Sequence, residues 1–257
     1  MVNIVADIGG TKTRIAIVRD GESFETPAIV DSPESDTELI SVITEAIHSA
    51  AQGESVEEII IGKPHWKRKP TFESDLQALL PVPVQFVNDA ALVGLGEAHF
   101  GAGKESPIFV YITISTGVNG VRIVDGRIDV STEGFEIGGQ YLGLDSSLSL
   151  EDMISGRAIH EKYGKHPKEL GKDHPAWEEL SKITAYGLHN TILHWSPDRV
   201  VLGGSMMNEI GIPLERVQFH LDTIMKKFPV LPELAHSALG DVGGLWGGVA
   251  LLKQKVF

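Results

Sequence analysis

The sequence predicts an α/β fold made of two similar halves that hold one ligand between them. Apolar runs typical of buried strands alternate with segments whose apolar residues recur at helical spacing. One order of elements occurs twice, at residues 2–26 and 108–130: strand, turn rich in glycine or threonine, strand, Asp-Gly turn, strand. The repeated order favours an internal repeat, although the two copies share this architecture more than their letters.

The first half is predicted to open as a meander of three strands. Residues 2–6 form an apolar run, residues 13–18 alternate β-branched with other side chains, and Asp20-Gly21 is typical of a two-residue hairpin turn. A third strand is expected near residues 23–26. The same patterns predict, in order, a helix at 36–51, a strand at 58–62, a helix at 72–80, a strand at 84–87 and a helix from 88 to about 100.

A polar, glycine-containing break at residues 101–107 marks the predicted domain boundary. Beyond it the patterns predict strands at 108–114, 120–124 and 127–130, a helical region near 150–163, a helix at 176–195, a buried strand at 199–202 and a last helix at about 245–256. We therefore expect an N-terminal domain at 1–104 and a C-terminal domain at 105–244, with the helix in 245–257 packing back on the first domain.

Composition and charge exclude several classes of protein. A formal net charge of −13 disfavours a general nucleic-acid-binding surface, because phosphate backbones require clustered Lys and Arg. The absence of cysteine excludes thiolate metal sites, cysteine nucleophiles and disulfides. The sequence has neither a signal-peptide pattern nor an apolar segment of about 20 residues. We expect a cytoplasmic protein with no membrane or nucleic-acid partner.

The stretch "DIGGTKT", residues 7–13, is the first candidate anion site. It lacks the spacing of a P-loop and leads into a strand, so the P-loop interpretation fails. What remains is a tight hairpin in which Gly9 and Gly10 let backbone N–H groups point at an anion, or else a purely structural β-turn. The acid at its head, Asp7, makes sense beside a triphosphate if Mg²⁺ lies between them, directly or through a metal-bound water.

A second turn, "STGVNG" at residues 115–120, occupies the matching place in the second half. Two such turns at corresponding positions favour a clamp for a polyphosphate group. The strand at 199–202 ends on Gly203-Gly204, where a flat adenine ring could lie against backbone with no side chain in the way.

Asn88 and Asp89 stand at the junction of a buried strand and a helix. Either could be an N-cap. Beside two phosphate turns, the carboxylate is also a candidate general base for a hydroxyl group. Glu133, Glu136 and Glu151 are either solvated or ligand contacts. The histidines show no metal-ligand spacing, and no Gly-x-Ser-x-Gly elbow supports serine hydrolysis.

Together these segments resemble the ROK family (repressors, uncharacterised frames and sugar kinases) of the actin-like, hexokinase-type ATPase fold. That fold has two ribonuclease H-like α/β domains with a ligand cleft between them. The resemblance covers most of the chain and keeps the family's order. It rests on six segments: 7–13, 87–90 with 96–97 and 100–103, 115–117, 134–138, 150–151 with 155–159, and 200–204.

The resemblance implies a sugar kinase that uses ATP and Mg²⁺. It implies that Asp89 accepts the proton of the sugar's primary hydroxyl, and that Asn88, Glu136 and Glu151 bind the other hydroxyls. The residues implied around the nucleotide are Gly9, Gly10, Thr11, Lys12, Thr116 and Gly117 at the phosphates and Gly203 and Gly204 at the adenosine.

The sequence departs from the family pattern where the family binds sugar and zinc. Gly139 stands in place of a histidine, and the following loop, residues 140–149, has no cysteine, so the family's zinc site is absent. Asn119 replaces a usual glycine of the second turn. Residues 61–80 are short and lack the usual Pro-Gly and Asn-Leu-Pro-Gly-Trp pieces. The stretch "GKPHW", residues 62–66, resembles a remnant of this segment, and its His65 is a candidate sugar contact. Because only six residues precede Asp7, we expect no helix-turn-helix of the repressor branch.

The sequence thus predicts a glucokinase-like enzyme that transfers the γ-phosphate of ATP to a primary hydroxyl of a hexose or an N-acylated hexosamine. Two alternatives stay open. One is a non-catalytic sugar- or nucleotide-sensing protein, favoured by the missing histidine and zinc loop. The other is a sugar kinase that uses polyphosphate as the donor. Phe219, Leu221 and Trp246 are either core residues or part of a homodimer interface.

Overall fold

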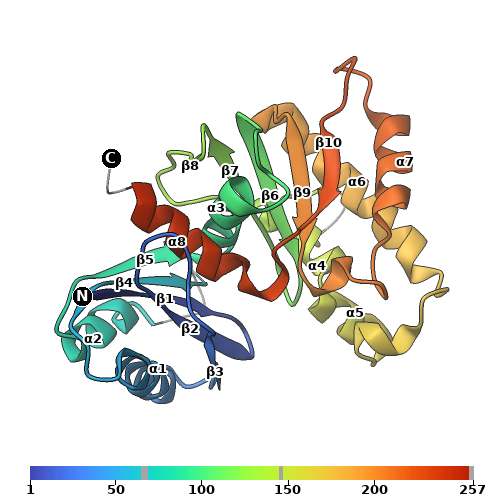
Figure 1. Cartoon of the computed structure of the whole chain (residues 1–257). Coiled ribbons are helices and arrows are strands. Elements are labelled where there is room, and N and C mark those ends of the chain that lie inside the picture. The colour runs from blue at the N-terminus through green and yellow to red at the C-terminus, as the bar shows by residue number, and fades with distance from the viewer. Residues whose placement is uncertain (65–68, 145–146, 255–257) are drawn as a thin grey trace. The chain divides into compact units, whose positions relative to one another are not determined.

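The computed structural model describes residues 1–64, 69–144 and 147–254, and the chain forms two compact units (Figure 1). Unit 1 comprises residues 1–100 and 241–257, and unit 2 comprises residues 101–240. Each unit contains one five-stranded mixed sheet with helices packed on it, which confirms the predicted α/β class. That these units are domains with the predicted bounds stays a prediction.

The sheet of unit 1 has the strand order β3-β2-β1-β4-β5. The elements of this unit are β1 (Val2–Ile8), β2 (Lys12–Val18), β3 (Ala28–Asp31), α1 (Asp36–Ala51), β4 (Val56–Lys63), α2 (Phe72–Leu79), β5 (Val84–Asn88), α3 (Asp89–Phe100) and α8 (Gly243–Gln254). The first three strands pair antiparallel, which confirms the predicted meander, whereas β1, β4 and β5 run parallel.

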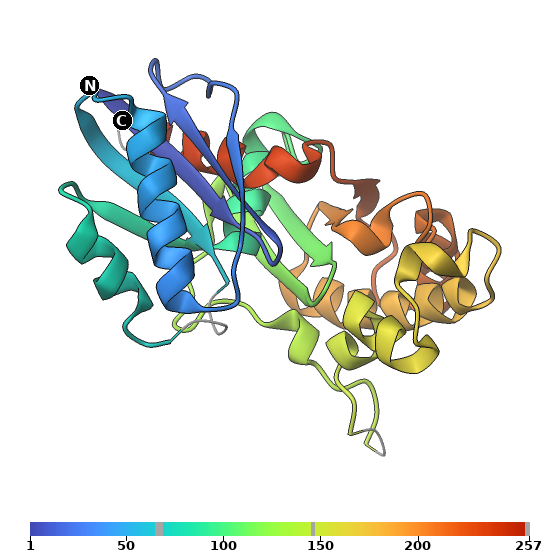
Figure 2. The same ribbon diagram turned by 90° about the horizontal axis from the view of Figure 1, so that it is seen from below.

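Helices cover both faces of this sheet (Figures 1 and 2). α1 and α2 pack on the face that carries Ile4 and Ile59, and α3 and α8 pack on the face that carries Val5 and Ile60. Successive side chains of a strand point to opposite faces, so β4 contributes to two cores. This explains why Ile59, Ile60 and Ile61 of β4 form a continuous apolar run in the sequence instead of an alternating one.

Glycines bring α8 close to α3 and β1. A Cβ atom at Gly247 would lie 1.7 Å from the carbonyl oxygen of Leu92, and one at Gly248 would lie 2.6 Å from Val5 Cγ1. The helix begins at Gly243, two residues before the predicted start, because glycines of its first turn also take part in this packing. Its end beyond Gln254 lies outside the described residues.

The third strand was predicted at residues 23–26, and this prediction is wrong. Asp20 Oδ1 accepts the N–H groups of Glu22 and Ser23, at 2.8 and 3.0 Å, so the Asp-Gly segment forms a local side-chain turn and no two-residue hairpin. The loop runs on to Pro27, and β3 pairs with β2 from Ala28 onward.

The sheet of unit 2 has the order β10-β9-β6-β7-β8. The elements of this unit are β6 (Ile108–Ile114), β7 (Val118–Val124), β8 (Arg127–Ile128), the short 3-10 helix η1 (Ile137–Gly139), α4 (Leu150–Ile154), α5 (Gly156–Tyr163), η2 (Pro167–Leu170), α6 (Ala176–Trp195), β9 (Arg199–Gly203), η3 (Ser205–Met207), α7 (Leu214–Ile224) and β10 (Glu233–His236); η4 (Gly240–Val242) joins the units. The antiparallel strands β6, β7 and β8 confirm the second meander, although β7 begins two residues earlier and β8 ends two residues earlier than predicted.

The helical region near residues 150–163 is two helices. Ser155 has an extended backbone, and its side chain caps α5 by accepting the N–H of Ala158 at 3.1 Å. α7 and β10 were not predicted. Val217 and Leu221 are the buried residues of α7, and β10 is a four-residue edge strand with no fully buried side chain. Neither element therefore leaves a strong periodic pattern in the sequence.

The three residues named for a possible dimer interface lie in different surroundings. Leu221 is buried in the core of unit 2, and Trp246 packs between Phe24 and Phe100 with ring centroids 4.9 and 4.5 Å away. Phe219 is 54% exposed. A homodimer stays a prediction.

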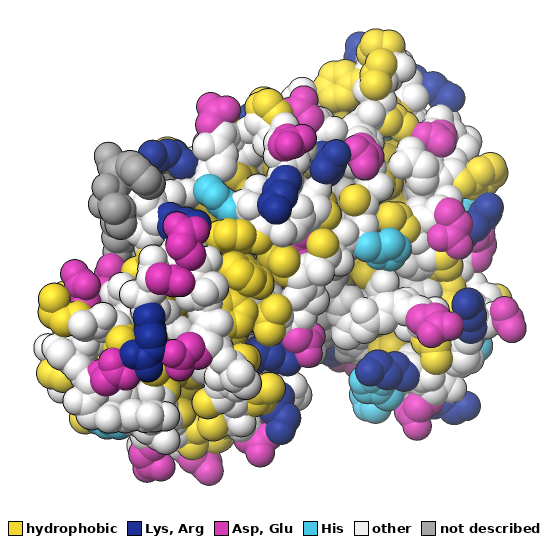
Figure 3. Space-filling model, viewed as in Figure 1, with side chains coloured by type: hydrophobic (Ala, Val, Ile, Leu, Met, Phe, Trp, Pro, Cys, Tyr) yellow, Lys and Arg dark blue, Asp and Glu magenta, His cyan; other side chains and the backbone are white. Residues whose placement is uncertain are grey.

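Acidic side chains are spread over the face shown in Figure 3, with Lys and Arg placed singly or in small groups among them. Lys12–Asp31 and Arg19–Glu54 are two of the surface ion pairs. In the part of the chain that the structure describes, none of the helices combines the length and the apolar character that a bilayer span requires.

Candidate functional site

Asp7, Asn88 and Asp89 lie at one edge of the first sheet. The parallel strands β1, β4 and β5 end there, with Asp7 beside Gly62 and Lys63 beside Asn88 in the ladder. The carboxyl ends of parallel strands are where α/β folds place their ligands. The folding of unit 1 thus brings together the residues that the sequence assigned to metal, sugar and proton transfer.

The first turn is tight at one glycine and open at the next. Gly9 N–H donates to the carbonyl oxygen of Lys12 at 3.0 Å, and a Cβ atom at Gly9 would lie 2.8 Å from that oxygen. Gly10 and Thr11 are exposed, and nothing lies within 4 Å of a Cβ at Gly10. Lys12 Nζ lies 2.5 Å from Asp31 Oδ1 in a surface ion pair, which is weak enough to yield to a phosphate.

Asn88 and Asp89 both make hydrogen bonds at the start of α3. Asn88 Oδ1 accepts the N–H of Ala91 at 3.0 Å, so Asn88 caps the helix, as the simpler interpretation of this residue predicted. The cap leaves the Nδ2 group with two N–H donors of its own. Asp89 is the first helical residue, and its Oδ1 accepts the N–H of Ala90 at 2.8 Å. The N-terminal end of a helix favours the ionised carboxylate that a general base requires.

Asp7 is half-buried beneath the start of α8. A Cβ atom at Gly244 would lie 2.4 Å from Asp7 Oδ2, so glycine is required for this approach. The pKa of Asp7 is raised to about 7, first by burial and then by the negative charge of Asp89; Arg14 opposes the shift and Asp241 adds to it. Arg14 is itself drawn to Asp241, with Nη2 2.6 Å from Oδ2.

These surroundings fit a bound Mg²⁺. Carboxylate oxygens are ligands that Mg²⁺ prefers, and a cation beside Asp7 would relieve the repulsion from Asp89. The described residues contain no group of three or more His, Cys, Asp or Glu side chains arranged to hold a metal by themselves. Mg²⁺ at nucleotide sites is commonly held by one or two carboxylates together with phosphate oxygens and water, which is the arrangement that Asp7 could serve.

Lys63 is a charged residue at the carboxyl end of β4 for which the sequence predicted no role. Its side chain is 8% exposed, and Nζ lies 2.9 Å from Oε1 of Glu73, which is 50% exposed. The signal was a single lysine ending the apolar run "EIIIGK". His65, the residue proposed for this segment, lies outside the described residues.

The second turn is held from two sides within unit 2. Ser115 N–H donates to the carbonyl of Gly117 at 2.8 Å, and the Ser115 carbonyl accepts the N–H of Gly156 at 2.7 Å. Glu151 Oε2 accepts the N–H of Val118 at 2.7 Å. Thr116, at the tip of the turn, is exposed.

Glu136 and Glu151 are both brought to the start of β7. Glu136 precedes η1, and η1 packs so closely on β7 that a Cβ atom at Gly138 would lie 2.1 Å from the carbonyl oxygen of Val118. Glu151 lies on α4 and binds the N–H of that same residue. Glu136 is exposed, whereas Glu151 is half-buried. Their predicted contacts with a sugar stay predictions.

Gly203 and Gly204 are required by packing inside unit 2. A Cβ atom at Gly203 would lie 2.7 Å from Tyr111 Oη, and one at Gly204, where φ is +91°, would lie 2.3 Å from the carbonyl oxygen of Ile114. The close approach of the chain to β6 therefore explains both glycines without a ligand. Their contact with adenosine stays a prediction.

Hydrogen bonds of Gln140 order the start of the segment, residues 139–149, where the family pattern has a zinc site. Gln140 Nε2 donates to the carbonyl of Ile137 at 3.0 Å, and Asn190 Nδ2 donates to Gln140 Oε1 at 3.1 Å. The sequence contains no cysteine that could complete a Cys/His site.

Comparison with known proteins identifies the family. The model of the ROK family matches residues 3–255. The chain belongs to the ROK family. Among curated proteins, this ROK protein is 27% identical to a fructokinase of Pediococcus pentosaceus, over 72% of this chain and 69% of the relative. It is 24% identical to an N-acetyl-D-glucosamine kinase of Escherichia fergusonii, over 95% of this chain and 97% of the relative.

The fold is also that of solved ROK proteins. The structure of a ROK glucokinase from Streptomyces griseus, in complex with glucose and AMPPNP, matches this one with a TM-score of 0.82 at 22% identity, over 99% of this chain and 100% of that chain. The predicted likeness to ROK sugar kinases is thereby confirmed, and so is the two-domain, actin-like fold class.

Proposed function

We propose that this ROK protein is an ATP-dependent sugar kinase that phosphorylates a primary hydroxyl of a hexose or an N-acylated hexosamine. The observation that carries the proposal is the edge of the first sheet, where Asp7, the Gly9–Lys12 turn and Asp89 occur together. A metal-binding acid, an anion turn and a general base are the groups that phosphoryl transfer to an alcohol requires.

In the proposed reaction, Asp89 accepts the proton of the acceptor hydroxyl as its oxygen attacks the γ-phosphorus of ATP. The bond between the γ-phosphorus and the β,γ-bridging oxygen breaks, and ADP leaves. Thr11, Lys12 and Thr116, with the amide groups of the two turns, would hold the phosphates, and Asp7 would hold Mg²⁺. The metal, when bound, neutralises charge on the phosphate oxygens. ATP as the donor is supported by the AMPPNP in the Streptomyces griseus relative.

The acceptor is proposed to be a hexose or its N-acylated amine. Asn88, Glu136 and Glu151 are the proposed partners of its other hydroxyls. The relatives described above are kinases of fructose, glucose and N-acetyl-D-glucosamine, which supports an acceptor of this class of compounds without choosing among them.

A coupled assay of ADP release tests the proposal. We expect that at least one of fructose, glucose, N-acetylglucosamine and N-acetylmannosamine stimulates ADP release from Mg·ATP. Asp89→Asn should lower kcat by about 10²- to 10⁴-fold, the usual contribution of a general base, while ADP still binds. Asp36→Asn is the matched control, because Asp36 is likewise the first residue of a helix in unit 1, and its turnover should stay at the wild-type level.

Two outcomes would contradict the proposal in different ways. If no sugar stimulates ADP release but sugar or nucleotide still binds, the protein is a sensor and not a kinase. If polyphosphate supports turnover and ATP does not, the enzyme class holds and the donor is wrong. Near-normal turnover of Asp89→Asn would remove Asp89 from the role of base.

A further inference from the structure

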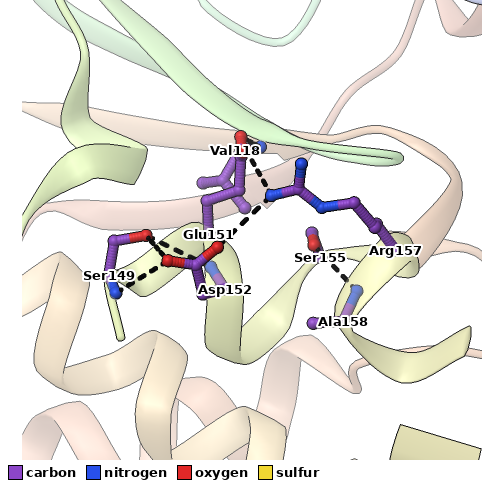
Figure 4. A network of polar contacts seen from close by, with 7 residues as sticks. All are labelled: Val118, Ser149, Glu151, Asp152, Ser155, Arg157 and Ala158. Atoms are coloured by element: carbon purple, nitrogen blue, oxygen red, sulfur yellow. Dashed lines mark hydrogen bonds and ion pairs between the residues drawn. The ribbon is translucent and has the colours of Figure 1, made fainter. Parts of the chain in front are cut away.

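Arg157 joins the two helices that lie beside the second turn. It is the second residue of α5, and its Nη2 atom lies 3.0 Å from Glu151 Oε1 and 3.3 Å from Asp152 Oδ1, both on α4 (Figure 4). Sequence reasoning gave Arg157 no role. In the structure it is the cation that faces the carboxylate of Glu151.

Glu151 is held between this arginine and the turn. One carboxylate oxygen accepts from Arg157, and the other accepts the N–H of Val118 at 2.7 Å. The contact is close, since a Cβ atom at Gly117 would lie only 2.6 Å from Glu151 Oε2. Figure 4 shows Glu151 reaching from α4 to Val118 with Arg157 approaching from the α5 side. Any movement of this carboxylate therefore changes the hydrogen bond that orients the end of the turn.

Further hydrogen bonds order the starts of α4 and α5 and tie α5 to the Ser115–Val118 turn. Ser149 and Asp152 form a capping box at the start of α4, and Ser155 caps α5. Gly156 N–H donates to the Ser115 carbonyl at 2.7 Å, so the residue before Arg157 holds the first residue of the turn. Asp152 is kept ionised beside Arg157, because the hydroxyl and N–H groups of Ser149 hold its pKa below the usual value.

We propose that Arg157 is a positioning residue for the nucleotide phosphates: through Glu151 it fixes the backbone of the Ser115–Val118 turn. The proposal rests on the proposed function of this turn in holding phosphate. Arginine suits the role because the Nη2 atom of its planar guanidinium contacts both carboxylates from a fixed direction, whereas an ammonium is a compact charge on a flexible stem. A half-exposed ion pair adds little stability by itself, so the main effect of Arg157 is on the geometry of the turn and not on folding.

The test compares Arg157→Ala and Arg157→Lys with wild type. We expect Arg157→Ala to raise the Kd of Mg·ADP and the KM of ATP about tenfold, as small misplacements of binding groups do, and by more than it raises the Kd of the sugar, while the Tm changes little. Arg157→Lys should recover part of the nucleotide affinity. Arg216→Ala is the matched control: Arg216 also pairs with a glutamate of unit 2, Glu178, and its exposure of 39% is close to the 44% of Arg157.

A second measurement does not depend on the kinase activity. Because Val118 N–H donates to Glu151, its hydrogen exchange in the ligand-free protein reports directly on the turn. We expect faster exchange at Val118 in Arg157→Ala and wild-type exchange in Arg216→Ala.

The outcomes separate the inference from the function on which it rests. If wild-type protein fails to bind Mg·ADP, the proposed function is wrong and the role of Arg157 falls with it. If wild type binds and turns over but Arg157→Ala keeps both its nucleotide affinity and its Val118 exchange, the inference alone is wrong. A selective loss of sugar affinity in Arg157→Ala would also overturn it, since Arg157 would then act on the sugar side of Glu151.

Discussion

At the scale of single residues, Asp7 occupies surroundings that disfavour its ionised form. Burial and the charge of Asp89 raise its pKa to about 7, so the free protein holds an acid that resists ionisation near neutral pH. The folded state binds a proton that the unfolded chain releases above about pH 4. Because only the unfolded chain ionises in this range, the free energy of unfolding of the metal-free protein falls as the pH rises from about 4 to about 7.

Asp7→Asn should separate the effect of this carboxyl group on stability from its proposed role in binding Mg²⁺. Asparagine cannot ionise, so we expect the variant to be more stable than wild type in Mg²⁺-free buffer at pH 8, by at most about 4 kcal/mol, with a difference that shrinks toward pH 5. Turnover should fall by orders of magnitude, and Mg²⁺ should raise the Tm of wild type but not of the variant. Thermal unfolding across pH, with and without Mg²⁺, measures both effects. An unchanged metal response would return Asp7 to the role of a turn residue.

The Lys63–Glu73 pair leads to a second prediction at this scale. Lys63 is almost fully buried, whereas Glu73 is half-exposed. Glu73→Gln removes the carboxylate that pairs with the buried ammonium of Lys63, so we expect a loss of about 1–3 kcal/mol in the free energy of unfolding. Lys63→Met removes the charge and keeps the length of the side chain, so it should cost less. Urea unfolding of both variants gives the comparison, and equal losses would contradict this account of the pair.

At the scale of elements, the fit of α8 depends on glycine. The Cβ of alanine at position 247 would lie 1.7 Å from a backbone oxygen of α3, which no rotamer change can relieve. We expect Gly247→Ala to destabilise unit 1 by more than about 3 kcal/mol or to prevent its folding. Gly139→Ala is the control, because nothing lies within 4 Å of its Cβ position, and its unfolding curve should match that of wild type. A mild effect at position 247 would show that α8 can move away from α3.

Elements with strong patterns were predicted from the sequence, and elements defined by tertiary contacts were not. The spacing of apolar residues gave α1 and α6 with their observed bounds, and the buried runs gave β4 and β6. The position of β3 depends on how the Asp20 side chain folds the preceding loop, and β10 is a short edge strand. Local composition carries little information about either one.

The candidate site shows the same division. Motif order identified the two turns and Asn88-Asp89, because each follows a strand with a clear signal. Lys63 and Arg157 were missed because their partners, Glu73 and Glu151, are given by the packing of helices and not by any local motif. Gly203 and Gly204 show the converse, since a pattern that suggested a ligand is also explained by close backbone packing.

At the scale of the whole molecule, each unit contributes one turn of the proposed phosphate clamp. The first turn lies between β1 and β2 of unit 1, and the second lies between β6 and β7 of unit 2. Each turn joins the first two strands of an antiparallel meander, so the repeat predicted from the sequence appears in the topology of both sheets. A single nucleotide that binds both turns would couple two units that have separate cores.

Hydrogen exchange with a bound nucleotide tests this coupling. If one Mg·ATP analogue contacts both turns, adding it should slow exchange in peptides that contain residues 9–12 and in peptides that contain residues 115–118, with the same dependence on analogue concentration, because one binding event protects both. Peptides from α1, which lies on the face of the first sheet away from Asp7, should not change and serve as the internal control. Protection of one turn alone, or of the two turns at different concentrations, would show that the turns do not hold a common ligand. The repeat would then be a feature of the fold without a shared function.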